Sequence, residues 1–182
     1  MQKLLFLDRD GVINKDIGYL SQISDIIFLD GIHELIERAL NNKFKIAIIT
    51  NQSGIGRKYF TEKQFHQLMS HMVHDLVEAI KSLKIDDISY YFCPHVPEDK
   101  CSCRKPLTGL FHTCQENFAI DVDWQNCIMV GDKITDIIAS ENMGVINNYL
   151  LVSEQNCDAD HRMSDISCDF NKILHLSEVK VS

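Results

Sequence analysis

Short apolar runs alternate along the chain with segments whose apolar residues recur at helical spacing. The runs are rich in Ile, Val, Leu, Tyr and Phe. They are apolar on both alternating faces, which is typical of strands in a parallel sheet covered on both sides. Five such strands are predicted, at residues 4–7, 45–50, 88–92, 127–130 and 145–151.

The segments between these runs have helical patterns. The longest helix should begin after Thr61, whose side chain can cap the first turn together with Gln64, and should continue to about Lys84. Strands that alternate with helices predict a doubly wound α/β fold, Rossmann-like, with one domain over residues 1–182. The shorter helices are expected at residues 33–40, 110–118 and 135–142.

The composition narrows the class of partner and the compartment. The 182 residues carry a formal net charge of -8, with a pI near 5.4 and no basic run, so we expect no nucleic-acid partner. No apolar stretch is long enough to span a membrane, and the first residues lack a secretory signal pattern. Seven cysteines, an odd number, argue against a complete disulfide framework. We therefore expect a cytoplasmic monomer with a small-molecule partner and no membrane partner.

Polar side chains with catalytic or ligand-binding chemistry follow the predicted strands directly. In a doubly wound sheet, ligands bind outside the carboxyl ends of the strands. Carboxylates, a hydroxyl and amides at one such edge indicate phosphate chemistry. The residues are Asp8 and Asp10 after the first strand, Thr50, Asn51, Gln52, Ser53 and Gly54 after the second, Cys93 and His95 after the third, and Gly131, Asp132 and Asp136 after the fourth.

Three of these carboxylates predict a magnesium site. Asp8, Asp10 and Asp132 would repel one another at one sheet edge unless a cation lay among them. Mg²⁺ is the cation that combines one or two carboxylates with water and phosphate oxygens. Phosphoryl transfer also needs a nucleophile and hydrogen-bond donors around the phosphoryl oxygens. Thr50, the backbone amides after it and a lysine can supply those donors.

A second cluster has the ligand set of a structural metal. Cys93, His95, Cys101 and Cys103 are spaced C-x-H-x5-C-x-C, and three thiolates with one imidazole satisfy tetrahedral Zn²⁺ without an open position. The alternative is reduced cysteines beside a surface histidine. A bound zinc ion would stiffen a loop that has little core of its own, directly before Arg104 and Lys105.

Four motifs together resemble those of haloacid dehalogenase-type phosphatases, and the resemblance covers residues 3–150. An isolated DxD pair carries little information, whereas four ordered motifs at consecutive strand ends are hard to obtain by chance. The motifs are LDRDGVIN at 7–14, IITNQSG at 48–54, CRKP at 103–106 and VGDKITD at 130–136.

Within that superfamily the two halves of the chain point to different substrates. The segments GYL at 18–20, FLDG at 28–31 and NQSGIGRKYFTEKQF at 51–65 are similar to D-glycero-D-manno-heptose 1,7-bisphosphate 7-phosphatases. The x5 gap in the cysteine loop and the TDIIASENMG segment resemble histidinol-phosphate phosphatases instead. We give more weight to the first half, because its loops flank the strand ends and would touch the leaving group.

The resemblance implies a two-step hydrolysis. Asp8 would attack phosphorus and form an aspartyl-phosphate, and Asp10 would protonate the leaving group and then deprotonate the attacking water. Asp132 would complete the magnesium site with the backbone carbonyl of Asp10, and Thr50 and Lys105 would hold the phosphoryl oxygens.

The resemblance also implies which residues contact the rest of the substrate. Asp136 is expected to orient the loop that carries Asp132. Tyr19 lies beside a glycine, and the alternative for this pair is a turn with a packed ring. The expected substrate contacts are Asp16, Gly18, Tyr19, Asn51, Gln52, Ser53, Arg104 and Lys133.

The expected function is that of a magnesium-dependent phosphatase with a structural zinc, acting on the 7-phosphate of a heptose 1,7-bisphosphate. Histidinol phosphate is the alternative substrate. A catalytically silent zinc-stabilised binding module is a further alternative, but it would require a missing nucleophile, acid or metal ligand. A DNA-end phosphatase shares the DxDG chemistry but does not fit the acidic charge. No large cap domain is expected after either of the first two strands.

A few positions remain outside this scheme. Val12 stands where the family usually has threonine, and a small effect is expected. Cys114 and Cys127 are predicted core residues, and a metal site of Cys157 and Cys168 with His161 is a weaker hypothesis. A polar helix face is predicted for His66, His71 and His74.

Overall fold

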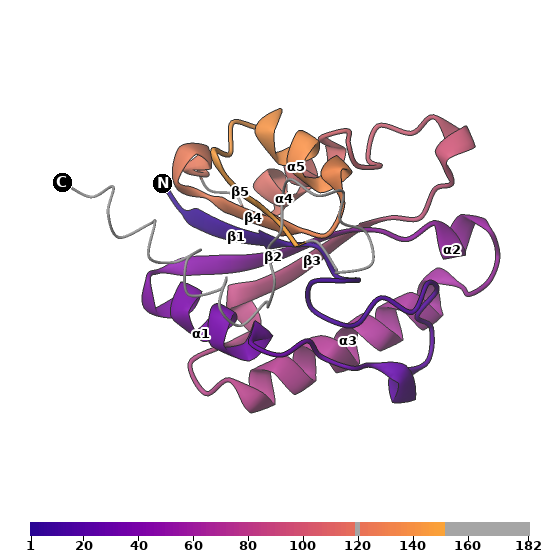
Figure 1. Cartoon of the computed structure of the whole chain (residues 1–182), viewed down its shortest axis with the longest axis horizontal. Helices are drawn as coiled ribbons and strands as arrows, with labels where there is room; N and C mark the ends of the chain where they lie inside the picture. The colour runs from indigo at the N-terminus through magenta and orange to yellow at the C-terminus, as the bar shows by residue number, and fades with distance from the viewer. Residues whose placement is uncertain (119–120, 152–182) are drawn as a thin grey trace, which may run out of the picture.

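The computed structural model describes residues 1–118 and 121–151, which form a single parallel sheet between two layers of helices (Figure 1). The strand order is β3-β2-β1-β4-β5, and each neighbouring pair is parallel. This order confirms the doubly wound α/β fold. The strands are β1 (Lys3–Leu7), β2 (Phe44–Asn51), β3 (Ile88–Cys93), β4 (Ile128–Gly131) and β5 (Asn147–Leu150).

Helices α1 (Ile32–Asn41) and α3 (Glu62–Ala79) cover one face of the sheet, and α4 (Gly109–Phe118) and α5 (Ile134–Glu141) cover the other (Figure 1). The central strand explains why both faces must be covered. Successive residues of a strand point to opposite faces, so Leu5 and Leu7 join the core beneath α1 and α3, whereas Leu4 and Phe6 join the core beneath α4.

The predicted elements are confirmed with shifted boundaries. The capping box at Thr61 is present, because Gln64 N donates to Thr61 Oγ1 at 3.2 Å and Thr61 N donates to Gln64 Oε1 at 2.8 Å. The extension of this helix to Lys84 was wrong. The helix ends at Ala79, because Ile80 is extended (φ -109°, ψ 97°).

Short helical segments that the pattern did not predict complete the chain. The short helix α2 begins two residues after β2 and lies at the carboxyl edge of the sheet (Figure 1). The segments are α2 (Ser53–Gly56) and the 3-10 turns η1 (Ile23–Asp25), η2 (Ile85–Asp87), η3 (Pro97–Asp99) and η4 (Trp124–Asn126).

The topology places the polar strand ends together. Strand β1 lies between β2 and β4, and the chain leaves these two neighbours towards opposite faces of the sheet. In doubly wound folds, ligands bind in the crevice outside the strand ends at such a point. No large inserted domain follows β1 or β2 within the described residues, since α1 begins at Ile32 and α3 at Glu62. Access to the crevice is therefore bounded by loops.

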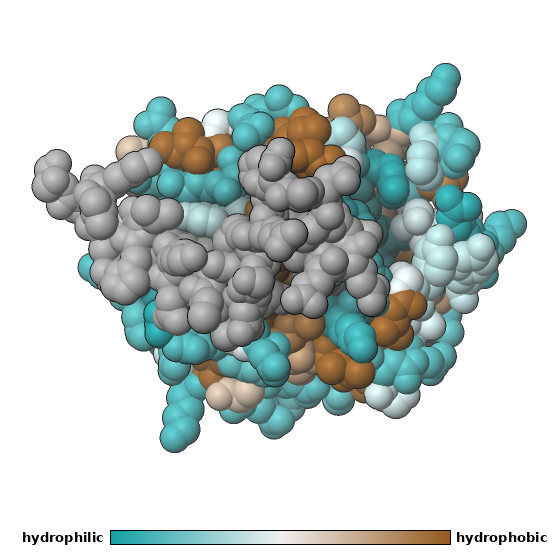
Figure 2. Space-filling model, viewed as in Figure 1, coloured by the Kyte–Doolittle hydropathy of each residue, from teal (hydrophilic) through white to brown (hydrophobic). Residues whose placement is uncertain are grey.

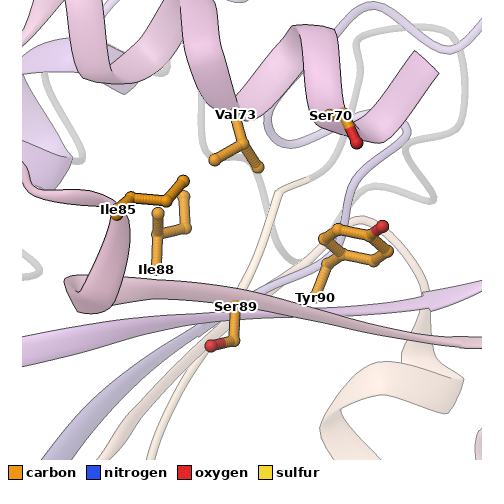
Figure 3. Close-up of a pocket in the computed structure, with 6 residues that line it drawn as sticks. All are labelled: Ser70, Val73, Ile85, Ile88, Ser89 and Tyr90. Atoms are coloured by element: carbon orange, nitrogen blue, oxygen red, sulfur yellow. The ribbon is translucent and has the colours of Figure 1, made fainter. Parts of the chain in front are cut away.

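A cavity of about 340 Å³ lies between α3 and the amino end of β3, away from the crevice (Figure 3). The cavity is lined by Ser70, Val73, Ile85, Ile88, Ser89 and Tyr90.

The face seen in Figure 2 is mostly hydrophilic, with hydrophobic side chains in separate patches. None of the described helices is long and apolar enough to cross a membrane.

Candidate active site

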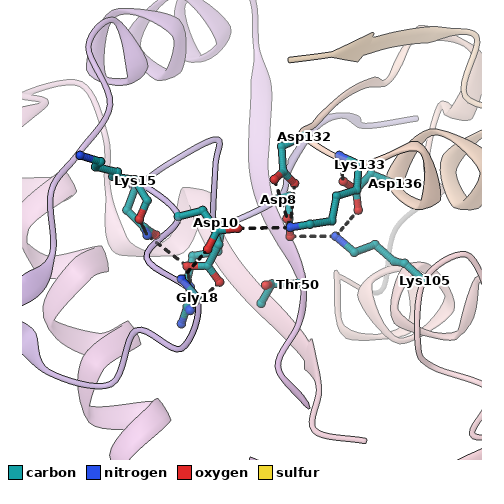
Figure 4. A network of polar contacts seen from close by, with 12 residues as sticks. Asp8, Asp10, Lys15, Gly18, Thr50, Lys105, Asp132, Lys133 and Asp136 are labelled. Atoms are coloured by element: carbon teal, nitrogen blue, oxygen red, sulfur yellow. Dashed lines mark hydrogen bonds and ion pairs between the residues drawn. The ribbon is translucent and has the colours of Figure 1, made fainter. Parts of the chain in front are cut away.

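Asp8 and Lys105 form the centre of the site, although they lie far apart in the sequence (Figure 4). Asp8 is the first residue after β1, and its backbone N–H donates to the Val130 carbonyl of β4 at 3.0 Å. Lys105 Nζ donates to Asp8 Oδ1 at 2.8 Å and forms an ion pair with Asp136 Oδ1 at 2.6 Å. All three of these charged side chains are buried. One buried ammonium thus serves two carboxylates.

Two further charges adjoin this centre. Lys133 Nζ lies 3.1 Å from Asp132 Oδ2, and this lysine side chain is about half exposed. Asp136 Oδ2 accepts from the backbone N–H of Lys133 at 3.0 Å. Asp136 therefore holds both Lys105 and the loop after β4, which agrees with the loop-orienting role expected for it. We call Asp8, Asp132 and Asp136 with Lys105 the acidic centre.

Glycines allow the carboxylates to approach so closely. Gly11 has φ +82°, and a Cβ added there would lie 2.5 Å from Asp132 Oδ2. A Cβ at Gly131 would lie 2.4 Å from Asp136 Cβ. Any side chain at Gly11 would also be strained by the positive φ. The glycine behind Asp8 and Asp10 is therefore required by both the turn and the space that Asp132 fills.

The acidic centre has more carboxylates than cations. Burial raises the pKa of Asp8 from 3.8 to about 7; Lys105 lowers it, while Asp136 and Asp132 raise it again. Burial also raises the pKa of Asp132, against the opposing effect of Lys133. Burial disfavours the charged form of Lys105, yet Asp8 and Asp136 raise its pKa overall. The lysine stays protonated while the carboxylates compete for it, which is the electrostatic setting of a cation site.

The carboxylates also have the geometry for a divalent metal. One oxygen from each of Asp8, Asp132 and Asp136 lies within 4.8 Å of the others. Hard carboxylate oxygens at this spacing fit Mg²⁺, which takes few carboxylates and leaves positions for water and phosphate. The side chain of Asp10 is outside this group, so any contact of Asp10 with the metal would come through its backbone, as the resemblance implies.

The Asp10 side chain lies outside this carboxylate group and accepts hydrogen bonds from three side chains. Arg9 donates to both of its oxygens, from Nε to Oδ1 at 3.0 Å and from Nη2 to Oδ2 at 2.6 Å. Asn14 Nδ2 adds a bond to Oδ1 at 3.1 Å, and Gln52 Nε2 adds one to Oδ2 at 3.0 Å. Arg9 is fully buried. These bonds fix the direction of the Asp10 carboxylate.

The residues at the carboxyl end of β2 and directly after it have two roles. Thr50 is buried, and its Oγ1 accepts from Gln52 Nε2 at 2.9 Å, which leaves the hydroxyl proton free to donate to a ligand. Asn51 binds the backbone of Lys105 through two hydrogen bonds. Its Oδ1 accepts from Lys105 N at 3.0 Å, and its Nδ2 donates to Lys105 O at 3.1 Å. Asn51 and Gln52 therefore position catalytic candidates in this structure, rather than facing an open space.

The loop at residues 16–19 lies across the crevice from α5. Asp16 Oδ2 is 3.5 Å from Lys133 Nζ, and Asp16 Oδ1 accepts from Gly18 N at 2.8 Å. Gly18 has φ +90°, a value that favours glycine. Tyr19 is 47% exposed, so its ring is not a buried packing residue. The structure thus brings Asp16, Gly18 and Tyr19 to the rim of the site.

The cysteine-histidine cluster (Cys93, His95, Cys101 and Cys103) converges as the spacing predicts. His95 Nδ1 lies 3.3 Å from Cys103 Sγ, and Cys103 Sγ lies 3.1 Å from Cys93 Sγ. Zinc bonds of about 2.3 Å would place ligands roughly 3.7 Å apart, so a modest expansion fits a tetrahedral ion. Although burial opposes it, bonds from the Arg104 backbone and the neighbouring thiols lower the pKa of Cys101 to about 7. Burial raises the pKa of Cys93 and of Cys103, so in the absence of a metal only Cys101 is shifted toward the thiolate.

This cluster joins the end of β3 to the segment that carries Arg104 and Lys105. Arg104 Nη1 donates to the His95 carbonyl at 3.3 Å, so this side chain is anchored to the loop itself. The cluster contains all four predicted ligands and lies at the same sheet edge as the acidic centre. It can fix the course of the chain into Lys105.

Sequence reasoning missed Arg9, which no strand-end rule singles out, and the pairing of Lys105 with Asp136. The prediction that Cys114 and Cys127 are core residues is confirmed, since both are buried. On α3, His66 Nδ1 contacts the Tyr90 hydroxyl at 2.9 Å, whereas His71 pairs with the partly buried Asp75 and His74 with the exposed Glu78, each one turn on. The predictions for Cys157, His161 and Cys168 lie outside the described residues.

Three comparisons show that the chain is similar to known phosphatases. A family model described as polynucleotide kinase 3 phosphatase matches residues 7–177. The D-glycero-beta-D-manno-heptose-1,7-bisphosphate 7-phosphatase of Helicobacter pylori is 43% identical over 175 residues, which is 96% of each chain. The D-glycero-alpha-D-manno-heptose-1,7-bisphosphate 7-phosphatase of Campylobacter jejuni is 41% identical over 158 residues, or 87% of each chain.

A solved structure has the same fold. The D,D-heptose 1,7-bisphosphate phosphatase of B. bronchiseptica, complexed with magnesium and phosphate, superposes with a TM-score of 0.77 at 24% identity, over 96% of this chain and 99% of that one. The fold and these matches define the protein as a phosphomonoesterase of the haloacid dehalogenase type. Within that class, the chain belongs to the D-glycero-D-manno-heptose-1,7-bisphosphate 7-phosphatase family.

Proposed function

We propose that the chain hydrolyses the 7-phosphate of D-glycero-D-manno-heptose 1,7-bisphosphate by way of an aspartyl-phosphate on Asp8. The observation that carries this proposal is the buried ion pair between Asp8 Oδ1 and Lys105 Nζ at 2.8 Å, at the open edge of a sheet. A carboxylate held there by a single ammonium has one oxygen directed by the lysine and another that remains for attack.

In the first step an Asp8 oxygen would form a bond to phosphorus while the bond between phosphorus and the sugar oxygen breaks. Asp10, carrying a proton, would pass it to the departing sugar oxygen. The donors on Asp10 from Arg9 and Gln52 hold its carboxyl in one orientation. Lys105 and the Thr50 hydroxyl would donate to the phosphoryl oxygens, where charge is greatest.

In the second step a water molecule would attack phosphorus and release inorganic phosphate from Asp8. Asp10, now ionised, would accept the proton of that water, which restores both carboxyls. The two carboxyl groups have different partners. Asp8 contacts Lys105 beside two other carboxylates, whereas Asp10 is surrounded by neutral donors and Arg9.

Magnesium would be held by Asp8 and Asp132, with the backbone of Asp10, and would neutralise charge on the phosphoryl group. The raised pKa values of Asp8 and Asp132 support a cation here. Zinc would be held by Cys93, His95, Cys101 and Cys103 as a closed structural site. Three thiolate ligands fit a reducing compartment, so we place the enzyme in the cytoplasm, as a monomer.

The loop at residues 16–19 and Arg104 would contact the sugar and its second phosphate. Asp16, Gly18 and Tyr19 lie at the rim on one side and Lys133 on the other, with Asp16 and Lys133 3.5 Å apart. Ser53 at the start of α2 would complete this set. The two relatives described above have names for opposite anomers, so sequence identity does not separate the anomers.

The proposal is tested by phosphate release with Mg²⁺ from both anomers of heptose 1,7-bisphosphate. Histidinol phosphate and a 3′-phosphorylated oligonucleotide are assayed in parallel, because they represent the alternative substrates. We expect kcat/KM for a heptose bisphosphate to exceed the others clearly, and we expect Asp8→Asn, folded and holding zinc, to be inactive. A preference for histidinol phosphate or for the oligonucleotide would overturn the proposed substrate but leave the chemistry intact.

A further inference from the structure

Two exposed tyrosines meet at the rim of the active site. Tyr59 is 61% exposed and Tyr19 is 47% exposed, so both rings are open to solvent. Their ring centroids are 4.7 Å apart with an interplanar angle of 76°, an edge-to-face pair. Two planes at this angle form a corner that can contact a ligand from two sides.

The chain ties both rings to the segment that carries the phosphate-binding candidates. Tyr59 N donates to the Gly54 carbonyl at 2.9 Å. A Cβ at Gly54 would lie 2.9 Å from Tyr19 Cδ1, so the Tyr19 ring rests against the backbone of α2. Gly54 is four residues after Thr50, and α2 lies at the carboxyl edge of the sheet (Figure 1). The tyrosine pair is therefore built onto the rim of the crevice.

The chemistry of the pair differs from that of the acidic centre. Lys105 and the carboxylates recognise charged oxygen and metal, whereas tyrosine rings offer an apolar face and one hydroxyl each. The carbon skeleton of a sugar has C–H groups on its faces and hydroxyls at its edges, so it matches this combination. Rings already held against α2 and each other lose little freedom when a ligand binds.

We propose that Tyr59 determines specificity for the sugar part of the substrate, forming with Tyr19 an aromatic corner against its carbon skeleton. This inference rests on the proposed function, because it assigns the occupant of the rim from the sugar substrate. It concerns substrate selection and not the chemical step at Asp8.

The test compares kcat/KM for heptose 1,7-bisphosphate with kcat/KM for acetyl phosphate, which has no sugar. Tyr59→Ala should lower the ratio of the two by about tenfold, mainly through a higher KM for the bisphosphate. Tyr59→Phe, which retains the ring, should keep the ratio within about twofold. Ile85→Ala, at an exposed apolar residue before the amino end of β3, is the matched control and should leave both values unchanged.

Each outcome separates the inference from the proposed function. If the wild-type chain prefers the bisphosphate but Tyr59→Ala keeps that preference, the role of Tyr59 is wrong and the proposed function stands. An equal loss on both probes in Tyr59→Ala also overturns it, since that pattern indicates general damage to the site. If the wild-type chain hydrolyses acetyl phosphate but not the bisphosphate, the proposed function fails and the inference fails with it.

Discussion

The acidic centre and the cysteine-histidine cluster both gather metal-type ligands at the carboxyl edge of one sheet, but they are built in opposite ways. The cluster comes from one short segment, residues 93–103, and uses all of its ligands on one another. The acidic centre draws on residues from Asp8 to Asp136 and includes an ammonium, Lys105, inside the carboxylate group. A closed set of ligands serves structure, whereas a set with unbalanced charge can act on a substrate.

The largest expected effect is loss of the nucleophile. Asp8→Asn should lower kcat by roughly 10³-fold or more, because no neighbouring carboxylate has the same place at the end of β1. Cys101→Ser in the other cluster should lower kcat far less. Steady-state kinetics at saturating substrate, with zinc content measured for both variants, make this comparison. Equal losses in the two variants would contradict the division of roles.

Lys105 in the acidic centre and Lys133 next to it provide a matched pair of variants that differ in burial. Lys105→Met leaves two buried carboxylates without their cation and should lower the free energy of unfolding by about 3–5 kcal/mol. Lys133→Met removes a half-exposed ion pair and should cost less than about 1 kcal/mol. Urea denaturation in the absence of Mg²⁺ measures both. A similar cost for the two lysines would show that burial does not set the strength of the pairing.

Removal of zinc should sharpen the contrast between the two clusters. A chelator that strips the cysteine-histidine cluster should lower Tm and raise KM, because the chain into Arg104 and Lys105 loses its support. Re-addition of Zn²⁺ should restore both, and Mg²⁺ alone should not. Activity that is fully recovered by Mg²⁺ without any zinc would show that the cluster does not position the site.

The pH dependence of stability should report the unbalanced charge at Asp8. Its pKa is about 7 in the folded chain and 3.8 is its ordinary value, so the folded state binds the proton more tightly between these values. The metal-free protein should therefore lose stability as pH rises from about 4 to about 7. Asp8→Asn should flatten this slope, and Mg²⁺ should reduce it. Thermal unfolding across this pH range, with and without Mg²⁺, provides the measurement.

The smallest effect on activity is expected at Val12, whose side chain is fully buried in the core beneath α1 and α3. Val12→Thr places a hydroxyl among apolar neighbours and should cost about 1–3 kcal/mol of stability. The change in kcat should stay within a few fold. Chemical denaturation measures the loss of stability, and steady-state kinetics measure the change in kcat. A large gain in kcat would mean that the valine limits catalysis.

The sequence was informative where the signal is local. Strand ends with carboxylates, the C-x-H-x5-C-x-C spacing and the capping box at Thr61 each depend on residues a few positions apart. The predicted end of α3 was wrong because it was also based on the local spacing of apolar residues. Leu76, Ile80 and Leu83 continue the helical spacing and are all buried, yet the backbone leaves the helix after Ala79. Burial of an apolar residue does not require a helix.

What the sequence could not provide depends on side chains that meet across the fold. Arg9 faces Asp10 only because the turn after β1 buries it, and nothing in the spacing distinguishes it from an exposed arginine. Asn51 resembles a substrate contact, but it binds the backbone of Lys105, which lies 54 positions away in the sequence. The pairing of Tyr19 with Tyr59 likewise requires the course of α2.

The central claim is that Asp8 becomes phosphorylated during turnover. The most direct test mixes the Asp10→Asn variant with substrate and Mg²⁺, quenches in acid and locates phosphate on peptides by mass spectrometry. The account predicts a phosphorylated peptide with the modification on Asp8, and none when Asp8→Asn is added to the same chain. Phosphate on another residue, or an unmodified Asp8 peptide during continued turnover, would contradict it.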